Sequence, residues 1–404
     1  MTQKTADAAH AMHKRAIIAI ASATGSTSLL VNVWFPFLPL YILQVGARDE
    51  AAALLWVAVG MSSLGVGRLI GGPMWGLLSD RLGRKKMFVR AVYFAALTSL
   101  VLSIINAPWQ VAIALALQGL LSGFVPAAVA LTSVSVPDAK VRDALNAVSG
   151  AQYLGGAIGP AVGAAMAIAF GYRGAIFTSG LLIAVVATAV IFLVPADTLR
   201  KKELGPSGAA IELPPFKPTV QFALAILLYF SLFTLGTFRA VATPIALKDI
   251  AGADVTAVTG LAFALGGIAS ALGVWILSTR FFRKHRLRDI LAVTCVLTAL
   301  AHLLLALSNS VWLYVLAFTL AAFLNASMMP ATNTMIALNV TRDRRGTAFG
   351  IGSAAQAVAF MVGPMGAAMF ATYSLKAGFA TVGVLLLALA TLVALTLREP
   401  QAEK

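Results

Sequence analysis

The chain has 404 residues, of which 60% are hydrophobic and 11% are charged, and its mean hydropathy is +0.90. A soluble domain carries about 25% charged residues, so this composition excludes an ordinary soluble fold and indicates a protein surrounded by lipid. The formal net charge of +15 would suggest nucleic-acid binding in a soluble protein, but the placement of the basic residues along the chain explains it without a nucleic-acid partner.

Taken in chain order, twelve apolar runs reach the length of about 20 residues that a membrane-spanning helix needs. The first run is too long for the core of a signal peptide and lacks a clear cleavage site, so we expect no cleavable leader. The sequence therefore predicts an all-α membrane protein with twelve transmembrane helices. The runs cover roughly residues 16–45, 52–78, 87–105, 109–136, 144–170, 174–195, 219–246, 255–279, 289–308, 311–338, 346–372 and 377–397.

The basic residues predict the orientation. Most of the 30 Lys and Arg residues fall in the two tails and in the loops after the even-numbered runs. Cytoplasmic loops carry the excess of Lys and Arg in membrane proteins, so both termini are predicted to be cytoplasmic. The positive charge is then a consequence of topology, and it also favours contact with anionic membrane lipid.

One pattern occurs twice, in the fifth and the eleventh run. Ala151-Gln152 precedes Gly159-Pro160 in the fifth run, and Ala355-Gln356 precedes Gly363-Pro364 in the eleventh at the same spacing. Such a repeat is expected when a chain consists of two related halves. Paired halves with a binding site between them are the architecture of a rocking transporter.

The boundary between the halves is predicted from composition. Residues 196–218 are polar and rich in Pro and Gly, which suits a flexible cytoplasmic connection. We therefore expect an N-terminal six-helix bundle at 1–195, a linker at 196–218 and a C-terminal six-helix bundle at 219–404.

Two motifs point to a known family. The loop after the second run reads Gly76-x-x-x-Asp80-Arg81-x-Gly83-Arg84-Lys85, which resembles the loop motif of the major facilitator superfamily. The fifth run contains Gly155-x-x-x-Gly159-Pro160-x-x-Gly163, which is similar to a motif of the drug-efflux branch of that superfamily. The resemblance covers the whole chain, and it implies the major facilitator fold and the export of small molecules by alternating access.

The loop residues have a physical rationale of their own. Gly76 and Gly83 permit close backbone approach and a sharp turn, and the carboxylate of Asp80 can face the positive N-terminus of a neighbouring helix. The resemblance implies that this neighbour is the eleventh helix. It also implies a charge network of Asp80 and Arg84 with the Arg142-Asp143 pair, which holds the halves together on the cytoplasmic side. The alternative is that the basic residues only anchor the topology.

In the fifth run, the spacing of Gly155, Gly159 and Gly163 places three small residues on one helix face, which allows tight packing in lipid. Pro160 removes a backbone donor and can kink the helix. The resemblance implies that this glycine face packs against the eighth helix and seals the outer side. The alternative is a packing surface without a role in transport.

The coupling ion is left open by the sequence. No acidic residue lies in the middle of a run, and the position that carries Arg in related drug–proton antiporters is Leu115. A proton-coupled carrier needs a titratable group at depth. His302 in the ninth run is the one such group, and a packed histidine is the simpler interpretation. The proton thus remains one candidate as the coupling ion.

Two arginines are embedded in the apolar runs, Arg68 in the second and Arg239 in the seventh. An unpaired cation at this depth costs at least about 2.5–3.5 kcal/mol, so each should face a cavity or a partner. The functional interpretation is contact with an anionic or strongly dipolar substrate. The alternative is that they bind helix carbonyls, with Arg239 extending outward towards Asp249.

Other candidates for a substrate cavity are polar or aromatic side chains on the runs expected to line it. Each could equally form an interhelical hydrogen bond, which contributes about 0.6 kcal/mol on average. These candidates are Asn32, Phe35, Gln118, Gln152, Tyr153, Asn325, Asn333 and Gln356.

The sequence therefore predicts a multi-pass secondary transporter of the bacterial inner membrane, a monomer in lipid, that exports small organic molecules including drugs. Two alternatives stay open. One is a carrier or exchanger of organic anions that uses Arg68 and Arg239, and the other is a transporter-like sensor that binds without transporting. The sequence contains no metal-ligand cluster, nucleophile–base pair or nucleotide-binding loop, so we expect neither an enzyme nor a cofactor or metal.

Overall fold

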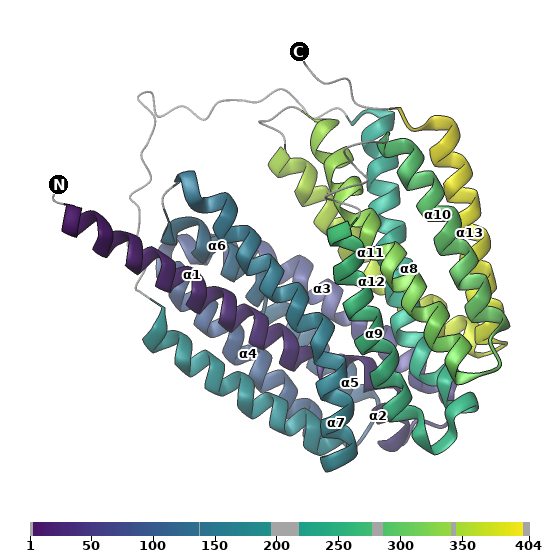
Figure 1. The fold of residues 1–404 in the computed structure, drawn as a ribbon. Helices are drawn as coiled ribbons and strands as arrows, with labels where there is room; N and C mark the ends of the chain where they lie inside the picture. The colour runs from purple at the N-terminus through teal and green to yellow at the C-terminus, as the bar shows by residue number, and fades with distance from the viewer. Residues whose placement is uncertain (1–2, 137, 195–217, 277–285, 341–344, 399–404) are drawn as a thin grey trace.

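The computed structural model describes residues 3–136, 138–194, 218–276, 286–340 and 345–398, and these ranges form helices joined by short turns (Figure 1). The α-helices are α1 (Gln3–Asn32), α2 (Leu38–Gln44), α3 (Glu50–Leu82), α4 (Arg84–Ile104), α5 (Trp109–Leu121), α6 (Phe124–Ser135), α7 (Asp138–Leu193), α8 (Val220–Ala251), α9 (Val255–Ile276), α10 (Leu287–Leu307), α11 (Val311–Leu338), α12 (Arg345–Ala371) and α13 (Leu375–Thr396). Two 3-10 turns, η1 (Phe35–Phe37) and η2 (Gly252–Asp254), complete the set.

Ten helical segments of the described chain are long and apolar enough to cross a membrane. Two of them, at 147–193 and 220–274, have 47 and 55 residues, which is far more than one crossing of about 20 residues needs. Both are interrupted near their middle. Helix α7 contains Gly171 at φ 69° and ψ 170°, and η2 separates α8 from α9. The predicted all-helical, multi-pass architecture is thus confirmed.

Two of the predicted apolar runs, 16–45 and 109–136, are each interrupted within their length. Pro36 and Pro39 accompany the turn η1 that separates α1 from α2. Gly123, at φ 66°, separates α5 from α6. Pro126 lies in the first turn of α6, where a missing backbone donor costs little. The break at Gly123 was not predicted, because a glycine in an apolar run fits a close helix contact equally well.

The repeated sequence pattern produces the same helix contact twice. If Gly159 carried a Cβ atom, that atom would lie only 2.5 Å from the Leu29 carbonyl oxygen of α1, so the two backbones approach too closely for a larger residue. A Cβ atom on Gly363 would likewise lie 2.5 Å from the Thr234 carbonyl oxygen of α8. Helix α1 thus packs on α7 as α8 packs on α12. The pairs α3–α5 and α4–α7 have counterparts in α9–α11 and α10–α13.

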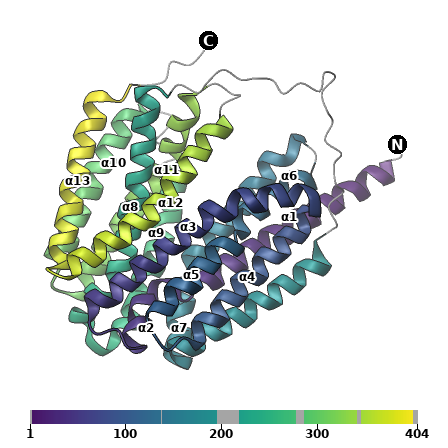
Figure 2. The same ribbon diagram turned by 180° about the vertical axis from the view of Figure 1, so that it is seen from behind.

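Figures 1 and 2 show two groups of helices, α1 to α7 and α8 to α13. The start of α1 and the end of α13 lie on the same side of the molecule, and on that side the two groups diverge. Towards the opposite side the groups meet, chiefly through α3 with α12 and α7 with α9. These four helices therefore form the boundary along which any movement of one group against the other has to occur.

Candidate functional site

The contact between α3 and α12 brings a cation onto an aromatic ring. A Cβ on Gly65 of α3 would lie 3.2 Å from Cγ of Met361, so the two backbones run close together here. One turn further along α3, the side chain of Arg68 is exposed, and its Cζ lies 5.9 Å from the centroid of the Phe360 ring of α12. Such a geometry allows a cation–π attraction across the boundary between the groups.

Phe360 is one end of a row of three rings. The centroids of Phe360 and Phe233 are 6.0 Å apart, and those of Phe233 and Tyr229 are 4.9 Å apart, with interplanar angles of 52° and 56°. These are favourable tilted arrangements. All three side chains are half-buried, so part of each ring is accessible. We call Tyr229, Phe233 and Phe360 the aromatic row; sequence analysis missed it, because aromatic residues in apolar helices carry no signal of their orientation.

Tyr153 of α7 lies close enough to Tyr229 of α8 for the charges of the two hydroxyl groups to interact. The side chain of Tyr153 is 71% exposed. The aromatic row therefore has a charged neighbour, Arg68, and a polar aromatic neighbour, Tyr153, both contributed by the first group of helices.

A separate groove of about 480 Å³ lies on the other face of α3. Arg68 points away from it, because an α-helix has about 3.6 residues per turn and this spacing puts Arg68 opposite the lining residues of α3. The groove is mainly apolar, and α5 and α12 complete it. Its lining residues are Val59, Ser62, Ser63, Val66, Gly67, Ile70, Ala116, Leu117, Leu120 and Met365.

Arg239, the second embedded arginine, is buried within the second group of helices. It is 8% exposed, and its Cζ lies 5.0 Å from the centroid of the Phe318 ring. Its Nε and Nη1 have no hydrogen-bond partner among the described residues. Among the described residues the side chain forms no ion pair with Asp249, and its burial keeps it from a solute, in contrast to Arg68.

His302 is also fully buried in the second group. Its Nδ1 lies 2.8 Å from the Thr298 carbonyl oxygen of its own helix, so this nitrogen carries the proton and donates it. This arrangement supports the simpler interpretation of His302 as a packed histidine.

The predicted polar residues occupy different environments. Asn32 donates from Nδ2 to the Ser28 carbonyl oxygen of its own helix at 2.8 Å. Asn325 donates to the Leu232 carbonyl oxygen at 3.3 Å and so links α11 to α8, as a structural hydrogen bond would. Gln118 is buried at 6% exposure, and its Oε1 has no partner in the described part of the chain. The remaining candidates, which like Asn32 and Asn325 are half-buried, are Phe35, Gln152, Asn333 and Gln356.

The glycine face of α7 packs against α1, contrary to what the resemblance implied. A Cβ on Gly155 would lie 2.1 Å from the Gly25 carbonyl oxygen, and one on Gly163 would lie 2.0 Å from the Val33 carbonyl oxygen. The spacing of small residues determines which face packs closely, but it does not identify the neighbouring helix.

Another face of α7 meets α9, the eighth of the predicted apolar runs. A Cβ on Gly267 would lie 2.8 Å from Cβ of Ala157, and one on Gly260 would lie 2.2 Å from Cβ of Ala164. The carbonyl oxygen of Pro160 lies 3.8 Å from the same point at Gly260. The close contact between the groups thus uses alanines of α7 and glycines of α9.

The turn between α3 and α4 confirms one prediction for the loop. Gly83 has φ 96°, a conformation that other residues rarely adopt, and it ends one helix directly before the next begins. Arg84 donates from Nη1 to the Ala130 carbonyl oxygen of α6 at 3.0 Å. The other network residues, Asp80, Arg142 and Asp143, and the loop residues Gly76 and Arg81 have surroundings outside the described part of the structure, so the network stays a prediction.

On the side opposite to the termini, two polar contacts join the groups. Lys248 Nζ at the end of α8 lies 2.6 Å from Glu50 Oε1 at the start of α3. The Tyr172 hydroxyl of α7 lies 2.7 Å from Thr256 Oγ1 of α9. Neither pair was predicted, because the partners are distant in sequence and no motif connects them.

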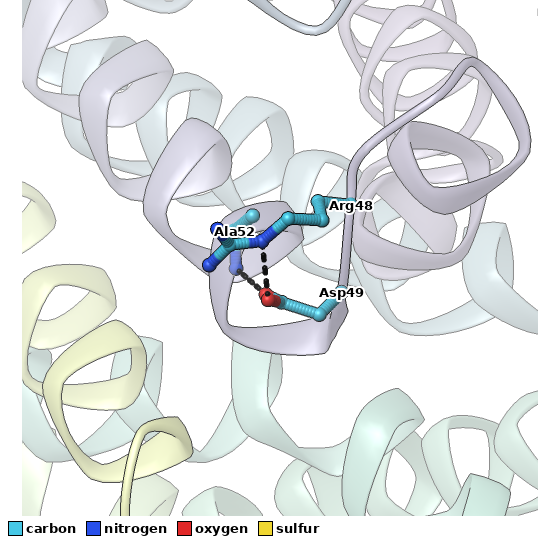
Figure 3. Close-up of polar contacts among 3 residues, drawn as sticks. All are labelled: Arg48, Asp49 and Ala52. Carbon is cyan, nitrogen blue, oxygen red and sulfur yellow. Dashed lines mark hydrogen bonds and ion pairs between the residues drawn. The ribbon is translucent and has the colours of Figure 1, made fainter.

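Beside Glu50, Asp49 caps the start of α3 (Figure 3). Its Oδ1 accepts a hydrogen bond from the Ala52 amide at 2.7 Å, and its Oδ2 accepts one from Arg48 Nε at 3.0 Å. The Ala52 amide first, and then the Arg48 guanidinium, lower the pKa of the Asp49 carboxyl below its ordinary value. The cap thereby fixes the helix end that carries Glu50.

Comparison with known proteins assigns the family. The sequence profile of the Major Facilitator Superfamily matches residues 16–288 and 225–404. The chain belongs to the major facilitator superfamily. The predicted resemblance is thus confirmed, and membership makes the chain a membrane transporter and not an enzyme.

Similar proteins include multidrug resistance proteins. The chain is 33% identical over 356 residues to multidrug resistance protein MdtG of Proteus mirabilis, covering 85% of this chain and 86% of that protein. It is 29% identical over 374 residues to MdtG of Salmonella paratyphi B, covering 90% of each.

Solved structures share the fold at low identity. An inward-facing, occupied bacterial homologue of the human lysosomal transporter Spinster has a TM-score of 0.73 at 14% identity, covering 95% of both chains. The human organic anion transporter MFSD10 has a TM-score of 0.65 at 16% identity, covering 94% of this chain and 99% of that one.

Proposed function

We propose that this chain exports small organic molecules, drugs among them, across the bacterial inner membrane by alternating access. Family membership and the MdtG relatives, which are named as multidrug resistance proteins, support this function. The working unit is a monomer in lipid, and the proton is the coupling ion to be tested first.

The moving parts are two six-helix halves, residues 1–195 and 219–404, connected by the linker at 196–218. Twelve crossings result when the two long apolar segments each cross twice, which the interruptions at Gly171 and η2 support. Cytoplasmic termini agree with the distribution of Lys and Arg and with the position of α1 and α13 ends on one side of the molecule (Figure 1).

With this orientation, the present arrangement is open to the cytoplasm. The groups diverge on the side of the termini, while Lys248–Glu50 and Tyr172–Thr256 join them on the opposite, outer side. An exporter binds its substrate from the inside in such a state.

The substrate site is the aromatic row with Arg68 and Tyr153 beside it. The observation that carries this proposal is the alignment of accessible rings from α8 and α12 with an exposed cation from α3, because it joins both halves at mid-membrane. Aromatic side chains bind flat apolar molecules of varied shape, which suits a multidrug exporter.

This site is tested with purified protein in proteoliposomes. Phe360→Ala is expected to weaken drug binding and lower export, because it removes the ring between Arg68 and Phe233. Phe370→Ala is the matched control: it truncates a ring of the same helix that packs on Phe238 at 6.2 Å, away from Arg68. Equal loss of export in both variants would contradict the proposed site.

A second candidate, the carriage of organic anions, is favoured by Arg68. This side chain is exposed and forms no salt bridge within the described ranges. In a site of low dielectric constant it attracts anions and repels cations. Arg68→Gln is expected to abolish export of anionic compounds and to spare neutral ones; unchanged anion export would exclude this role.

The same reconstituted protein distinguishes a transporter from a sensor. A sensor would be stabilised thermally by drugs without moving them across the vesicle membrane. Export that follows an imposed pH gradient and stops when the gradient is dissipated would establish proton coupling, whereas export independent of pH would point to another driving ion.

A further inference from the structure

The fourth crossing is broken inside the membrane. Helix α5 ends at Leu121, Ser122 has φ −81° and ψ −98°, and Gly123 lies in the left-handed region at φ 66° before α6 begins. A break in a membrane helix leaves the last carbonyl groups of α5 without partners in their own helix. Such groups need donors from elsewhere, because lipid offers none.

Neighbouring helices provide these donors. Trp75 Nε1 of α3 donates to the Leu120 carbonyl oxygen at 2.7 Å, and Arg90 Nη2 of α4 donates to the Ser122 carbonyl oxygen at 3.2 Å. The Ser122 hydroxyl in turn donates to the Ala91 carbonyl oxygen at 3.0 Å. The break is therefore attached to both α3 and α4.

Arg90 is the centre of this arrangement. Its Cζ lies 3.5 Å from the centroid of the Trp75 ring, so the guanidinium stacks on the indole. Its cation lies at the C-terminal end of α5, where the helix dipole is negative. Arg90 Nε and Nη1 are buried without a hydrogen-bond partner, and no salt bridge to Arg90 occurs in the described part of the chain.

Helix α4 also contacts the far side of the break. Arg84 donates to the Ala130 carbonyl oxygen of α6, whereas Arg90 donates to the end of α5. Arg84 belongs to the loop motif, and Trp75 directly precedes Gly76, the first residue of that motif. The residues around the loop thus bind both segments of the broken helix.

We propose that Ser122–Gly123 is a hinge of the transport cycle and that Arg90, stacked on Trp75, is the positioning residue that sets the angle between α5 and α6. The inference rests on the proposed alternating-access function. Through Arg90 and Trp75, the hinge links the loop between α3 and α4 to the cytoplasmic half of the fourth crossing. A movement of the loop therefore changes the direction of α6.

The first test separates turnover from binding. Arg90→Gln keeps a donor but removes the charge and the stacked plane, and we expect about tenfold slower export with substrate affinity retained. Arg90→Lys is expected not to restore export, because an ammonium group cannot stack on the indole. Arg173→Gln is the matched control: Arg173 Nη2 also donates to a helix-end carbonyl, that of Ile105, at 2.7 Å, but at an unbroken helix.

A second variant tests the hinge without touching Arg90. A Cβ on Gly123 would meet only Pro126 Cγ, at 3.8 Å, so Gly123→Ala acts through the positive φ and not through a clash. We expect slow export with retained affinity here too. Gly150→Ala, where a Cβ would meet nothing within 4 Å and φ is not positive, is the control for the substitution itself.

Distances report the hinge directly. Ile113 of α5 and Val129 of α6 are exposed, and the one native cysteine, Cys295, is buried, so spin labels on Ile113→Cys and Val129→Cys are selective. Drug binding should change the label distance in the wild type, and Arg90→Gln should reduce that change.

The hinge and the exporter function would be contradicted by different results. A wild-type protein that exports drugs with an unchanged label distance would overturn the hinge and leave the exporter function intact. An Arg90→Gln variant with normal export, or with binding and export lost in equal measure, would also overturn it. A wild-type protein that exports no compound at all would overturn the function instead.

Discussion

The two embedded arginines have opposite surroundings, which determines what each can do. Arg68 is exposed beside an aromatic ring contributed by the other half, whereas Arg239 is buried over Phe318 in the second group of helices. A buried cation without an acid partner opposes folding, because its desolvation is not repaid by a salt bridge.

Replacement of Arg239 should therefore be tolerated. Arg239→Met keeps an unbranched side chain of similar length over Phe318 and removes the buried charge, so the melting temperature in detergent is expected to stay equal or to rise. Arg68→Met is the control and should lower anion export without changing the melting temperature. A fall of several degrees in Arg239→Met would show that the guanidinium makes essential contacts.

Asp49 gives a dependence of stability on pH. Its pKa is lowered in the folded protein, so its contribution is fully present above its ordinary pKa of 3.8 and is lost as the pH falls through the lowered folded value. The melting temperature of the wild type should exceed that of Asp49→Ala near neutral pH, and the difference should shrink in acid. Asp49→Asn retains an acceptor at every pH, so a similar decline in that variant would contradict the assignment to the carboxylate.

At the level of helices, glycine spacing determines where backbones touch. Gly163 lies one turn beyond Gly159, and Gly159 is the counterpart of Gly363 in the repeated pattern. A Cβ on Gly163 or on Gly363 would lie 2.0 Å from the nearest atom of the adjacent helix. At Gly163 this atom is a backbone carbonyl oxygen, which cannot move without displacing the helix, and at Gly363 it is the Thr237 hydroxyl oxygen with the Thr234 carbonyl close behind.

Alanine at these glycines should separate the helices. Gly163→Ala is expected to destabilise the fold by about 1–3 kcal/mol, because overpacking forces a shift of α7 against α1. Gly156→Ala is the matched control in the same helix, since its Cβ would meet nothing nearer than 3.7 Å. Thermal unfolding of the two variants compares the effects, and equal melting temperatures would contradict the observed packing.

The sequence analysis and the structure agree on those features of each helix that local pattern determines. Composition predicted the helices, the glycine spacing predicted close packing in the fifth run, and the loop motif predicted the sharp turn at Gly83. The prediction of which helix packs against the glycine face of α7 was wrong. The break at Gly123 and the aromatic row were not predicted. These features depend on which helices lie side by side, and that arrangement results from the packing of the entire chain, which a local pattern does not contain.

At the scale of the whole molecule, the two groups of helices touch on one side and diverge on the other (Figures 1 and 2). This difference between the two sides is the basis of the transport cycle. Lys248–Glu50 and Tyr172–Thr256 join the two groups of helices on the side opposite to the termini, which is the proposed outer side. Alternating access requires that these contacts open when the cytoplasmic side closes. A partly exposed ion pair such as Lys248–Glu50 contributes about 0–1 kcal/mol, so it can break and form again within a cycle.

Fixing the outer contact should therefore stop transport while leaving binding intact. In the double variant Glu50→Cys with Lys248→Cys, a short thiol-specific crosslinker is expected to abolish export, because the outer side can no longer open, and drug binding from the cytoplasmic side should persist. Asn106→Cys with Arg173→Cys is the control, since that pair, 3.2 Å apart in the native protein, lies within one half. A cleavable crosslinker should restore export on reduction. Export that continues at full rate in the crosslinked protein would mean that the halves do not separate at this contact.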